Sequence, residues 1–426
     1  MSCKIPIVSL TDDQKEKIDD ELRIELEVSS FASGPFGSST PKKYIYPYEI
    51  VDEDVFLPFY YAYNNINQKR PKRIKQAKIN LDFIFNLREE QKEVKKEAID
   101  ILNKKGSVLL ALACAFGKTF TSTYIACKIG LKTLVIVNKV VLMKQWKESI
   151  LKTCPDAKIQ LLTSKSPLKD CDFYIINAIN VPKLDPEYYK HIQTLIVDEC
   201  HLIMAELLSK CMQHVFPRYL IGLSATPYRP DGLTKLLDLY FGQYKIIREL
   251  YRYHIVYKVN TGFKPKVELT KAGKVNWGSI LDSQANDPDR NEMIIQIVKD
   301  HPDRAFLILV KRITQGEHLL QRLEEEGEYV DSLLGKNQEF NTKTRILVGT
   351  TSKVGVGFDW PKADALLLAA DLQEYFIQYL GRVFRRKDMT PIIFDIVDDN
   401  RILKRHYTTR SKVYKKHGGE IKIYKL

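Results

Sequence analysis

Two short segments, about eighty residues apart, carry side chains that could handle a phosphorylated ligand. The first reads Ala-Cys-Ala-Phe-Gly-Lys-Thr over residues 113–119, between an apolar run at 108–112 and a helix-like stretch at 120–126. This pattern predicts the turn between a buried strand and a helix, whose free N–H groups and positive dipole end attract anions. Lys118 then supplies a mobile cation for the β- and γ-phosphates, and the Thr119 hydroxyl is placed to bind Mg²⁺.

The second segment, residues 195–201, is an apolar strand that ends in two carboxylates. Asp198 can hold the same Mg²⁺, directly or through a water, and Glu199 can polarise the attacking water. Each segment also has an ordinary interpretation, because Gly-Lys-Thr occurs by chance and an Asp-Glu at a strand end is usually a solvated edge. In addition, Leu112 replaces the first glycine of the usual phosphate-loop pattern. Their order, each behind an apolar strand, favours hydrolysis of a nucleoside triphosphate.

The composition is that of a basic globular protein. Its 426 residues predict two or three domains at about 100–200 residues each, and an apolar fraction of 44% permits large cores. A net charge of +13 and a pI near 9.1 favour a polyanionic partner, although a basic pI alone is a weak indicator. No apolar stretch reaches the ~18–20 residues of a membrane span, and the N-terminus has no signal-peptide pattern.

Cysteine usage predicts a reducing, intracellular compartment. The cysteines are scattered, odd in number and contain no C-x2-C pair, so that neither a zinc site nor an iron–sulfur cluster is indicated. They are Cys3, Cys114, Cys127, Cys154, Cys171, Cys200 and Cys211.

Two blocks of the chain alternate short apolar strands with helical stretches, the first from about residue 87 to 250 and the second from 305 to 397. Between them the pattern weakens at residues 262–288, where prolines interrupt it. Near-continuous apolar runs are typical of strands buried on both faces of a parallel sheet. The sequence therefore predicts an α/β fold of two tandem domains, each a parallel sheet covered by helices. The expected strands lie at 133–137, 173–176, 194–197, 219–223, 306–310, 345–348, 365–368 and 392–394.

Residues 1–86 differ in character from both blocks. They include an aromatic-rich stretch at 44–63 and a basic run from Lys69 to Lys78. We predict a small N-terminal accessory or DNA-binding region in which the basic run forms a mobile or extended arm, because Pro71 discourages one continuous helix. A solvated linker or a nuclear-localisation-like run explains the same charges equally well. The end of the chain from Arg401 is also basic, as a surface helix would be.

A further cluster of charge lies in the second block, at residues 378–386. Arg382 and Arg385 are three positions apart in a helical stretch, so they should share one helix face. Guanidinium groups presented across a cleft can stabilise charge on a γ-phosphoryl group during transfer. A solvated basic helix face is the alternative. The glycine beside Arg382 and the glutamine four positions before it, Gln378, favour the catalytic role.

Six motifs occur in series. They are Leu87 to Gln91, the phosphate loop, Asp198 to His201, Ser224 to Arg229, Val354 to Asp359 and Gln378 to Arg385. In order and spacing the chain resembles a superfamily 2 helicase from about Leu87 to Asp398, and most of all the subgroup of XPB-type and UvsW-type DNA helicases and the poxvirus transcript-release helicase. The resemblance implies two RecA-like domains, at about 87–260 and 275–426. It also implies ATP bound between them and translocation along one strand, usually 3′ to 5′.

The resemblance also assigns roles to individual residues. Gln91 is expected to read the adenine edge through its amide, which favours ATP over GTP. His201 couples the ATP site to the neighbouring domain, and Ser224 and Thr226 link the ATP state to the grip on nucleic acid. The expected nucleotide-binding residues are Arg88, Gln91, Cys114, Ala115, Phe116, Gly117, Lys118, Thr119, Gly357 and Asp359. The expected catalytic residues are Lys118, Asp198, Glu199, Gln378, Arg382 and Arg385, with Thr119 and Asp198 as the Mg²⁺ ligands.

Nucleic-acid contacts are expected from loops at strand ends. Lys139 and Arg312 each follow a strand, and in superfamily 2 such loops track the phosphate backbone. Thr350 is a further candidate. Trp146 lies at core spacing on a helix, so we expect it in the core rather than as a base-stacking platform. Ordinary turn chemistry also explains the serine and glycines of the later motifs.

Two positions depart from the family pattern. Ala115 stands where a glycine is common, and Asn138 stands where a proline is frequent. Alanine does not favour positive φ, so Ala115 would strain a loop that needs left-handed backbone. We expect a modest adjustment rather than loss of activity. Neither an Arg-Glu-Asp motif of the XPB type nor a nuclease constellation is evident, which argues against a restriction-type or repair-nuclease function.

These features predict an ATP-dependent DNA helicase or translocase of superfamily 2, encoded by a large DNA virus and acting in transcription termination, recombination or repair. Its cofactors would be ATP and Mg²⁺. Its partners would be single-stranded DNA, duplex junctions, an RNA–DNA hybrid and the transcription or replication machinery, with no membrane. It would act in the host cytoplasm, the virion or the nucleus. An RNA helicase is one alternative. A transcription factor that uses ATP only as a switch is another, against which the complete hydrolytic residues argue.

Overall fold

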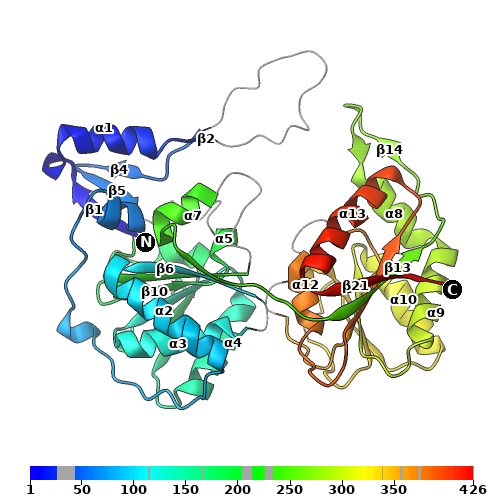
Figure 1. Ribbon diagram of the computed structural model, residues 1–426. Coiled ribbons are helices and arrows are strands. Elements are labelled where there is room, and N and C mark those ends of the chain that lie inside the picture. The colour runs from blue at the N-terminus through cyan, green and yellow to red at the C-terminus, as the bar shows by residue number, and fades with distance from the viewer. Residues whose placement is uncertain are drawn as a thin grey trace. The chain divides into compact units, whose positions relative to one another are not determined.

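The computed structural model forms two compact units, Met1–Glu249 and Leu250–Leu426 (Figure 1). Each unit contains a 7-stranded sheet. Within the described residues, no helix has the length and apolar character needed to cross a membrane. The structure describes residues 1–25, 44–113, 116–165, 167–203, 214–225, 234–337, 339–355, 358–372 and 376–425.

The sheet of the first unit is parallel throughout, in the order β12-β6-β11-β10-β7-β9-β8. Its central strands are buried along their whole length, which explains their near-continuous apolar sequences. The strands are β6 (Ser107–Leu112), β7 (Thr133–Val137), β8 (Ile159–Leu162), β9 (Phe173–Asn177), β10 (Thr194–Val197), β11 (Tyr219–Ser224) and β12 (Lys245–Arg248). The helices around them are α2 (Glu89–Lys105), α3 (Lys118–Ile129), α4 (Val140–Thr153), α5 (Cys200–Ile203) and α7 (Thr234–Phe241).

The second unit repeats this architecture with the order β17-β18-β16-β19-β20-β13-β21, again parallel throughout. Separate apolar clusters pack the sheet and its helices. Its strands are β13 (His254–Asn260), β16 (Phe306–Val310), β17 (Val330–Leu333), β18 (Ile346–Thr350), β19 (Ala365–Leu368), β20 (Ile392–Val397) and β21 (Gly419–Tyr424). Its helices are α8 (Trp277–Asn286), α9 (Pro288–Lys299), α10 (Ile313–Glu325), α11 (Thr351–Val354), α12 (Phe376–Val383) and α13 (Arg401–Lys416).

The predicted α/β class of two tandem parallel-sheet domains is confirmed, but the boundary between them differs from the expected one. We expected residues 87–260 to form the first domain and 275–426 the second. Strand β13 instead pairs with β20 and β21, so residues 254–260 belong to the second sheet. The chain therefore crosses between units at Glu249 and Leu250.

The N-terminal region is a small layer built on the first unit. Strands β1 (Ser2–Pro6), β5 (Asp54–Pro58) and β4 (Glu49–Val51) form an antiparallel sheet that α1 (Asp12–Glu21) accompanies. This region has an apolar cluster of its own, while Phe59 packs into the core of the large sheet. Strands β2 (Ile24–Glu25) and β3 (Tyr44–Ile45) form a further short pair. The described parts of residues 1–66 are thus folded and belong to the first unit, and an accessory or DNA-binding role of this region stays a prediction.

The basic run from Lys69 to Lys78 has no regular structure up to Ile74 and a 3-10 turn at Lys75–Ala77, and it is fastened to the first unit rather than loose. Arg70 donates to the carbonyl oxygens of Leu102 (3.1 Å) and Asn103 (2.9 Å) in the last turn of α2. The side-chain amide of Gln193 bridges two backbone groups of the run, at Lys72 and Ile74. The other cations, Lys69, Lys72, Arg73, Lys75 and Lys78, remain exposed.

Candidate active site

The phosphate loop leads from β6 into α3, as the sequence predicts. Gly117 is the N-cap of α3 with φ +88°, and a Cβ atom there would lie 2.4 Å from Nε2 of Gln91. Only glycine fits that conformation and that space. The next residue, Lys118, donates from Nζ to the carbonyl oxygen of Leu112 at 3.1 Å. Its ammonium group therefore lies over the end of β6, beside the free N–H groups of the helix.

Two predicted members of this loop, Cys114 and Ala115, lie outside the described residues. Thr119, in the first turn of α3, is half-buried.

The side chain of Gln91 supports the phosphate loop through hydrogen bonds. Its Nε2 donates to the carbonyl oxygen of Phe116 at 2.9 Å, and its Oε1 accepts from the backbone N–H of Arg88 at 2.8 Å. The Arg88 guanidinium donates to the same Phe116 oxygen. Gln91 is only 2% exposed, so a buried side chain joins the first motif to the phosphate loop. Adenine recognition by Gln91 stays a prediction, whereas this supporting role was not foreseen.

The strand order brings the two acidic residues near the phosphate loop. Strand β11 lies between β6 and β10, and all three run in the same direction. Because carboxyl ends of parallel strands meet at one edge of the sheet, the loop after β6 and Asp198 after β10 lie at the same edge. Lys118 is close enough to Asp198 to lower the pKa of its carboxyl.

Asp198 receives a hydrogen bond that the sequence did not predict. Trp146 on α4 donates from its indole Nε1 to Oδ2 of Asp198 at 2.8 Å. Trp146 is 2% exposed, which agrees with the expectation that it belongs to the core. Its one polar group nevertheless points at the carboxylate. One signal in the sequence could have predicted this contact. A buried indole N–H needs a hydrogen-bond acceptor, and acceptors are few in an apolar core.

The electrostatic setting of Asp198 suits a metal ligand. Burial raises the pKa of its carboxyl to about 6, and the neighbouring charge of Glu199 acts in the same direction. The hydrogen bond from Trp146 and the charge of Lys118 lower this pKa and so partly offset the effect. A buried carboxylate with too little positive charge around it favours binding of a cation.

Glu199 is held in an unusual backbone conformation, with φ +46°. Its backbone N–H donates to Oδ1 of Asp198 at 3.0 Å, which fixes the two acidic residues relative to each other. Its own carboxylate lies 3.5 Å from Nδ1 of His201. That ring nitrogen also lies 3.0 Å from Oγ of Ser224, at the end of β11. A chain of polar contacts therefore joins Glu199 to the fourth motif, which begins at Ser224, while Thr226 lies outside the described residues.

The buried Oε2 atom of Glu199 accepts no hydrogen bond within the part of the chain that the structure describes. A buried carboxylate oxygen with unused acceptor capacity can orient a water molecule.

In the second unit Arg382 contacts its own domain. Its guanidinium donates to the carbonyl oxygens of Phe358 (2.5 Å) and Gly355 (2.6 Å), which flank the loop of the fifth motif. Gly357, inside this loop, lies outside the described residues. Arg385 pairs with Asp359 on the same motif. Helix α12 ends at Val383, so Arg385 does not extend the helix face that carries Arg382, contrary to our expectation.

The remaining predicted residues occupy several places. Gln378 on α12 is 3% exposed, and its Nε2 has no hydrogen-bond partner among the described residues. Thr350 precedes α11, with its hydroxyl 3.2 Å from that of Ser352. Arg312 precedes α10 and donates to Oδ1 of Asp282 at 2.6 Å.

Lys139 is the N-cap residue of α4, at the carboxyl end of β7.

The contacts described above bring Lys118, Asp198, Glu199 and His201 together in the first unit. It brings Arg382, Arg385 and Asp359 together in the second. Whether Arg382 and Arg385 act on a ligand held by the first group remains a proposal.

Sequence comparison with curated proteins shows several related chains, one of which matches end to end. "Putative helicase 161L" of Invertebrate iridescent virus 6 is 44% identical over 100% of both chains. The chain belongs to the superfamily 2 helicases of large DNA viruses. "Putative helicase 055L" of Frog virus 3 is 34% identical over 79% of each chain. Residues 84–229 match the family model described as "Type III restriction enzyme, res subunit". "Transcript termination protein A18" of Yaba-like disease virus is 25% identical over 81% of this helicase and 78% of its own length.

Solved structures show the same fold. Dbp5 of S. cerevisiae, bound to RNA and ADP BeF3, aligns with a TM-score of 0.58 at 14% identity. The alignment covers 78% of this helicase and 89% of Dbp5. Together with the relatives, the two parallel-sheet units identify tandem RecA-like domains. The protein is accordingly a nucleic-acid-dependent ATPase.

Proposed function

We propose that this helicase hydrolyses ATP to move along DNA, and that it acts in transcription termination, recombination or repair. The observation that carries the proposal is the meeting of Lys118, Asp198 and Glu199 at the carboxyl edge of one parallel sheet. These residues supply a cation, a metal-binding carboxylate and a water-orienting carboxylate, which ATP hydrolysis requires. The relationship to A18 supports a role in transcription, and the net charge of +13 supports a polyanionic partner.

Mg²⁺ fits the donor set of this site. It prefers oxygen ligands and is usually held by one or two carboxylates together with substrate phosphates. Asp198 and the Thr119 hydroxyl offer such oxygens, and burial leaves the Asp198 carboxylate short of positive charge. When bound, the ion would neutralise charge that develops on the phosphoryl group.

We assign the other steps of ATP hydrolysis and its coupling to nucleic acid to individual residues. Lys118 exchanges its contact with Leu112 for the β- and γ-phosphate oxygens, and the N–H groups at the start of α3 bind the same phosphates. Glu199 orients the attacking water. Arg382 and Arg385 stabilise charge on the phosphoryl group from the second domain. His201 and Ser224 pass the state of this site to the nucleic-acid contacts at Lys139, Arg312 and Thr350.

A phosphate-release assay tests which nucleic acid stimulates ATP turnover. ATP turnover is measured alone and with equal nucleotide amounts of single-stranded DNA, duplex DNA, single-stranded RNA and an RNA–DNA hybrid, using Glu199→Gln as the background control. We expect DNA to stimulate turnover more than RNA does. Stimulation by RNA alone would identify an RNA helicase instead. If no nucleic acid stimulates phosphate release, the alternative of a transcription factor that uses ATP only as a switch is favoured.

A strand-displacement assay tests movement. Duplexes with a 3′ tail, a 5′ tail, a fork or an RNA–DNA hybrid are incubated with ATP, and release of the shorter strand is followed. We expect release from tailed or forked DNA that depends on ATP hydrolysis. Stimulated hydrolysis without release would describe a translocase that does not separate strands.

A further inference from the structure

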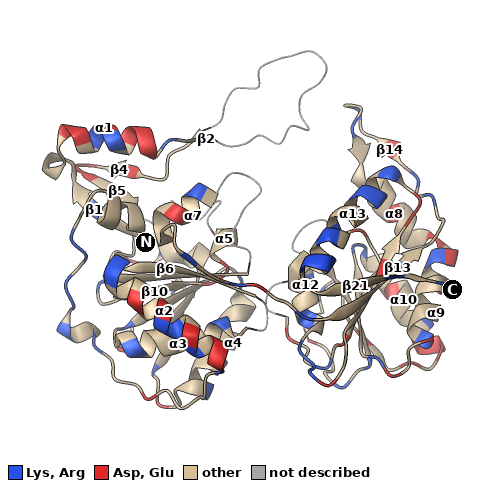
Figure 2. Cartoon of the chain, viewed as in Figure 1, with Lys and Arg blue, Asp and Glu red and all other residues tan. Residues whose placement is uncertain are grey.

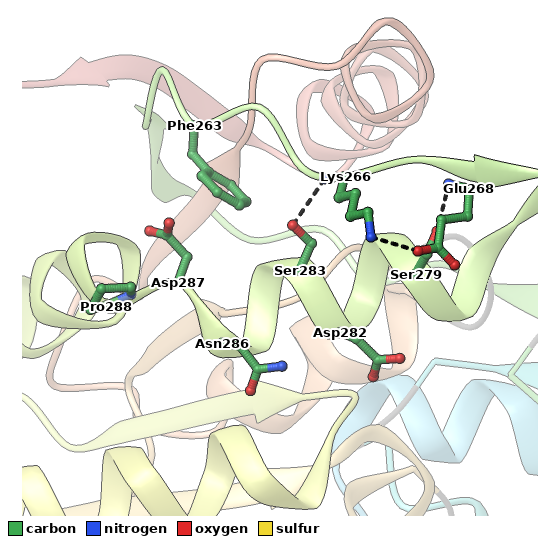
Figure 3. A pocket seen from close by; sticks show the side chains of 9 residues that line it. All are labelled: Phe263, Lys266, Glu268, Ser279, Asp282, Ser283, Asn286, Asp287 and Pro288. Atoms are coloured by element: carbon green, nitrogen blue, oxygen red, sulfur yellow. Dashed lines mark hydrogen bonds and ion pairs between the residues drawn. The ribbon is translucent and has the colours of Figure 1, made fainter.

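A short hairpin in the second unit stands on the surface beside α8. Strands β14 (Glu268–Leu269) and β15 (Val275–Asn276) pair antiparallel, and Gly273 with φ +72° closes the turn between them. Figure 3 shows how the first strand is attached to the helix. The backbone N–H groups of Lys266 and Glu268 donate to the hydroxyls of Ser283 and Ser279, each at 2.9 Å. These serines are one helical turn apart, so α8 holds β14 at Glu268 and the chain that leads into it at Lys266.

The segment 266–269, which leads into and includes β14, has polar side chains against α8 and apolar side chains away from the pocket. The side chains of Lys266 and Glu268 line a pocket of about 440 Å³ against α8, and they pair with each other at 2.8 Å (Figure 3). Val267, directly before β14, and Leu269, in β14, do not line that pocket. They are 42% and 65% exposed. The hairpin therefore presents an apolar face to solvent, to which Val275 opposite Leu269 contributes.

An exposed aromatic ring lies at the base of the hairpin. Trp277 begins α8, directly after β15, and is 36% exposed. Its ring is supported by the ring of His406 on α13, with centroids 5.4 Å apart. The adjacent backbone oxygen, of Gly278, accepts a hydrogen bond from Arg312 at 3.3 Å. Arg312 is one of the residues that we expect to contact a phosphate backbone.

Cationic side chains surround these apolar groups. Lys271 and Lys274 lie exposed in the turn of the hairpin. Helix α13, which carries His406, has lysines and arginines along its length (Figure 2). Two of the acidic groups nearby are paired with cations, Asp282 with Arg312 and Glu268 with Lys266. Apolar and aromatic groups within a positive surface suit nucleic acid, whose bases stack and whose phosphates are anionic.

We propose that the β14–β15 hairpin and Trp277 form a contact site for nucleic-acid bases at the end of a duplex. Trp277 stacks on an unpaired base, Leu269 and Val267 contact the terminal base pair, and Lys271 and Lys274 hold the flanking phosphates. The site deepens the proposed helicase function and rests on it. Positive charge in the turn favours this occupant over a protein partner.

Intrinsic fluorescence gives a direct test, because Trp277 is the exposed member of the three tryptophans. Trp146 and Trp360 are 2% and 1% exposed. A forked DNA is added without ATP, and the emission is recorded together with its quenching by acrylamide. We expect the DNA to quench the wild-type emission and to shield it from acrylamide. Trp277→Phe should lose both changes while binding the same DNA.

Affinity and strand separation give the second test. Trp277→Ala should weaken binding to the fork at least about fivefold, the scale of removing one base stack. Leu269→Ala should slow strand displacement more than it lowers ATP turnover stimulated by single-stranded DNA. The matched control is Ile423→Ala, because Ile423 is 68% exposed on the edge strand β21 of the same unit. Both truncations remove an exposed side chain, so neither should alter folding.

The outcomes separate this site from the function on which it rests. If DNA stimulates ATP turnover but leaves the emission and the Leu269→Ala displacement rate unchanged, the hairpin site is overturned and the helicase function stands. If no polymer stimulates turnover, the proposed function fails first. If the emission changes only with a protein of the transcription machinery, the hairpin is a protein-docking surface instead.

Discussion

The indole N–H of Trp146 and the Asp198 carboxylate are joined by a hydrogen bond of 2.8 Å that ties helix α4 to the end of β10. The bond restricts one carboxylate oxygen of a residue that we assign to Mg²⁺. Because the donor is buried and Asp198 can be charged, its loss should cost more than that of an ordinary hydrogen bond.

Trp146→Phe keeps an aromatic ring in the core and removes the donor. We expect metal affinity to fall roughly tenfold, the low end of the usual effect of losing a group that orients a metal ligand. Manganese binding to the nucleotide-loaded protein and the Mg²⁺ dependence of turnover measure it. Trp360→Phe is the matched control, because Trp360 is equally buried and its Nε1 donates to the Thr342 carbonyl at 3.2 Å. Equal metal affinity in both variants would remove the positioning role.

Asp198→Asn should stabilise the protein while it abolishes turnover. Folding raises the pKa of this carboxyl from 3.8 to about 6, so its ionisation destabilises the folded state, partly above pH 3.8 and fully above pH 6. We expect a gain of about 1–2 kcal/mol in the free energy of unfolding at pH 7.5 without metal or nucleotide, and less at pH 5. Denaturant unfolding at both pH values tests this. A loss of stability at pH 7.5 would contradict it.

Glu199→Gln preserves the shape of the side chain but removes the charge that orients water. Hydrolysis should fall by at least ~10²-fold, the usual scale for a positioned acid–base group, while ATP binding persists. Single-turnover phosphate release and equilibrium binding of a fluorescent ATP analogue measure the two quantities. Glu89→Gln, on the first turn of α2, controls for removal of an exposed carboxylate. Near-normal turnover in Glu199→Gln would reject the assigned role.

Arg382→Ala and Arg385→Ala should lower turnover more than they weaken nucleotide binding, because a guanidinium that acts on transition-state charge contributes little to the ground state. Turnover numbers and nucleotide affinities are compared for each variant, with exposed Lys387→Ala as the control. An equal loss in both quantities would indicate that Arg382 serves mainly to hold the loop between Gly355 and Phe358.

The exposed lysines of the basic run should bind phosphate. Changing Lys69, Lys72, Lys75 and Lys78 to alanine should weaken binding to forked DNA. It should also flatten the log-affinity against log-salt slope by about 0.7–0.9 for each phosphate that the run no longer neutralises. Unwinding should fall more than basal ATP hydrolysis. Arg70→Ala is the contrasting variant, because its removal should lower stability instead. If the salt-dependence slope and the unwinding rate are both unchanged, the basic run is a linker without a role in DNA binding.

The sheets were predictable because their strands are buried on both faces, and such strands need long apolar runs. The phosphate loop and Asp198 were predictable because each follows one of these strands directly. Side-chain contacts between distant segments carried no local signal. Trp146 and Asp198 are 52 positions apart in the sequence. The basic run is held at Ile74 by a hydrogen bond to Gln193, 119 positions later.

The boundary between the domains was misplaced for a related reason. The apolar sequence of β13 is compatible with either parallel sheet, and only its pairing with β20 and β21 decides between them. The end of α12 at Val383 was also missed, because the residues after it still include arginines and a phenylalanine, which helices accept.

Strand β11 works as a spacer of fixed width. It separates the strand that ends in the phosphate loop from the strand that ends at Asp198, and neighbouring strands lie about 4.8 Å apart, so the two loops start roughly 10 Å from each other. That span comes from backbone hydrogen bonds and not from any side chain. Relatives can therefore exchange most apolar residues of this sheet and still keep the same distance between ammonium group and carboxylate, provided that the order of the strands is preserved.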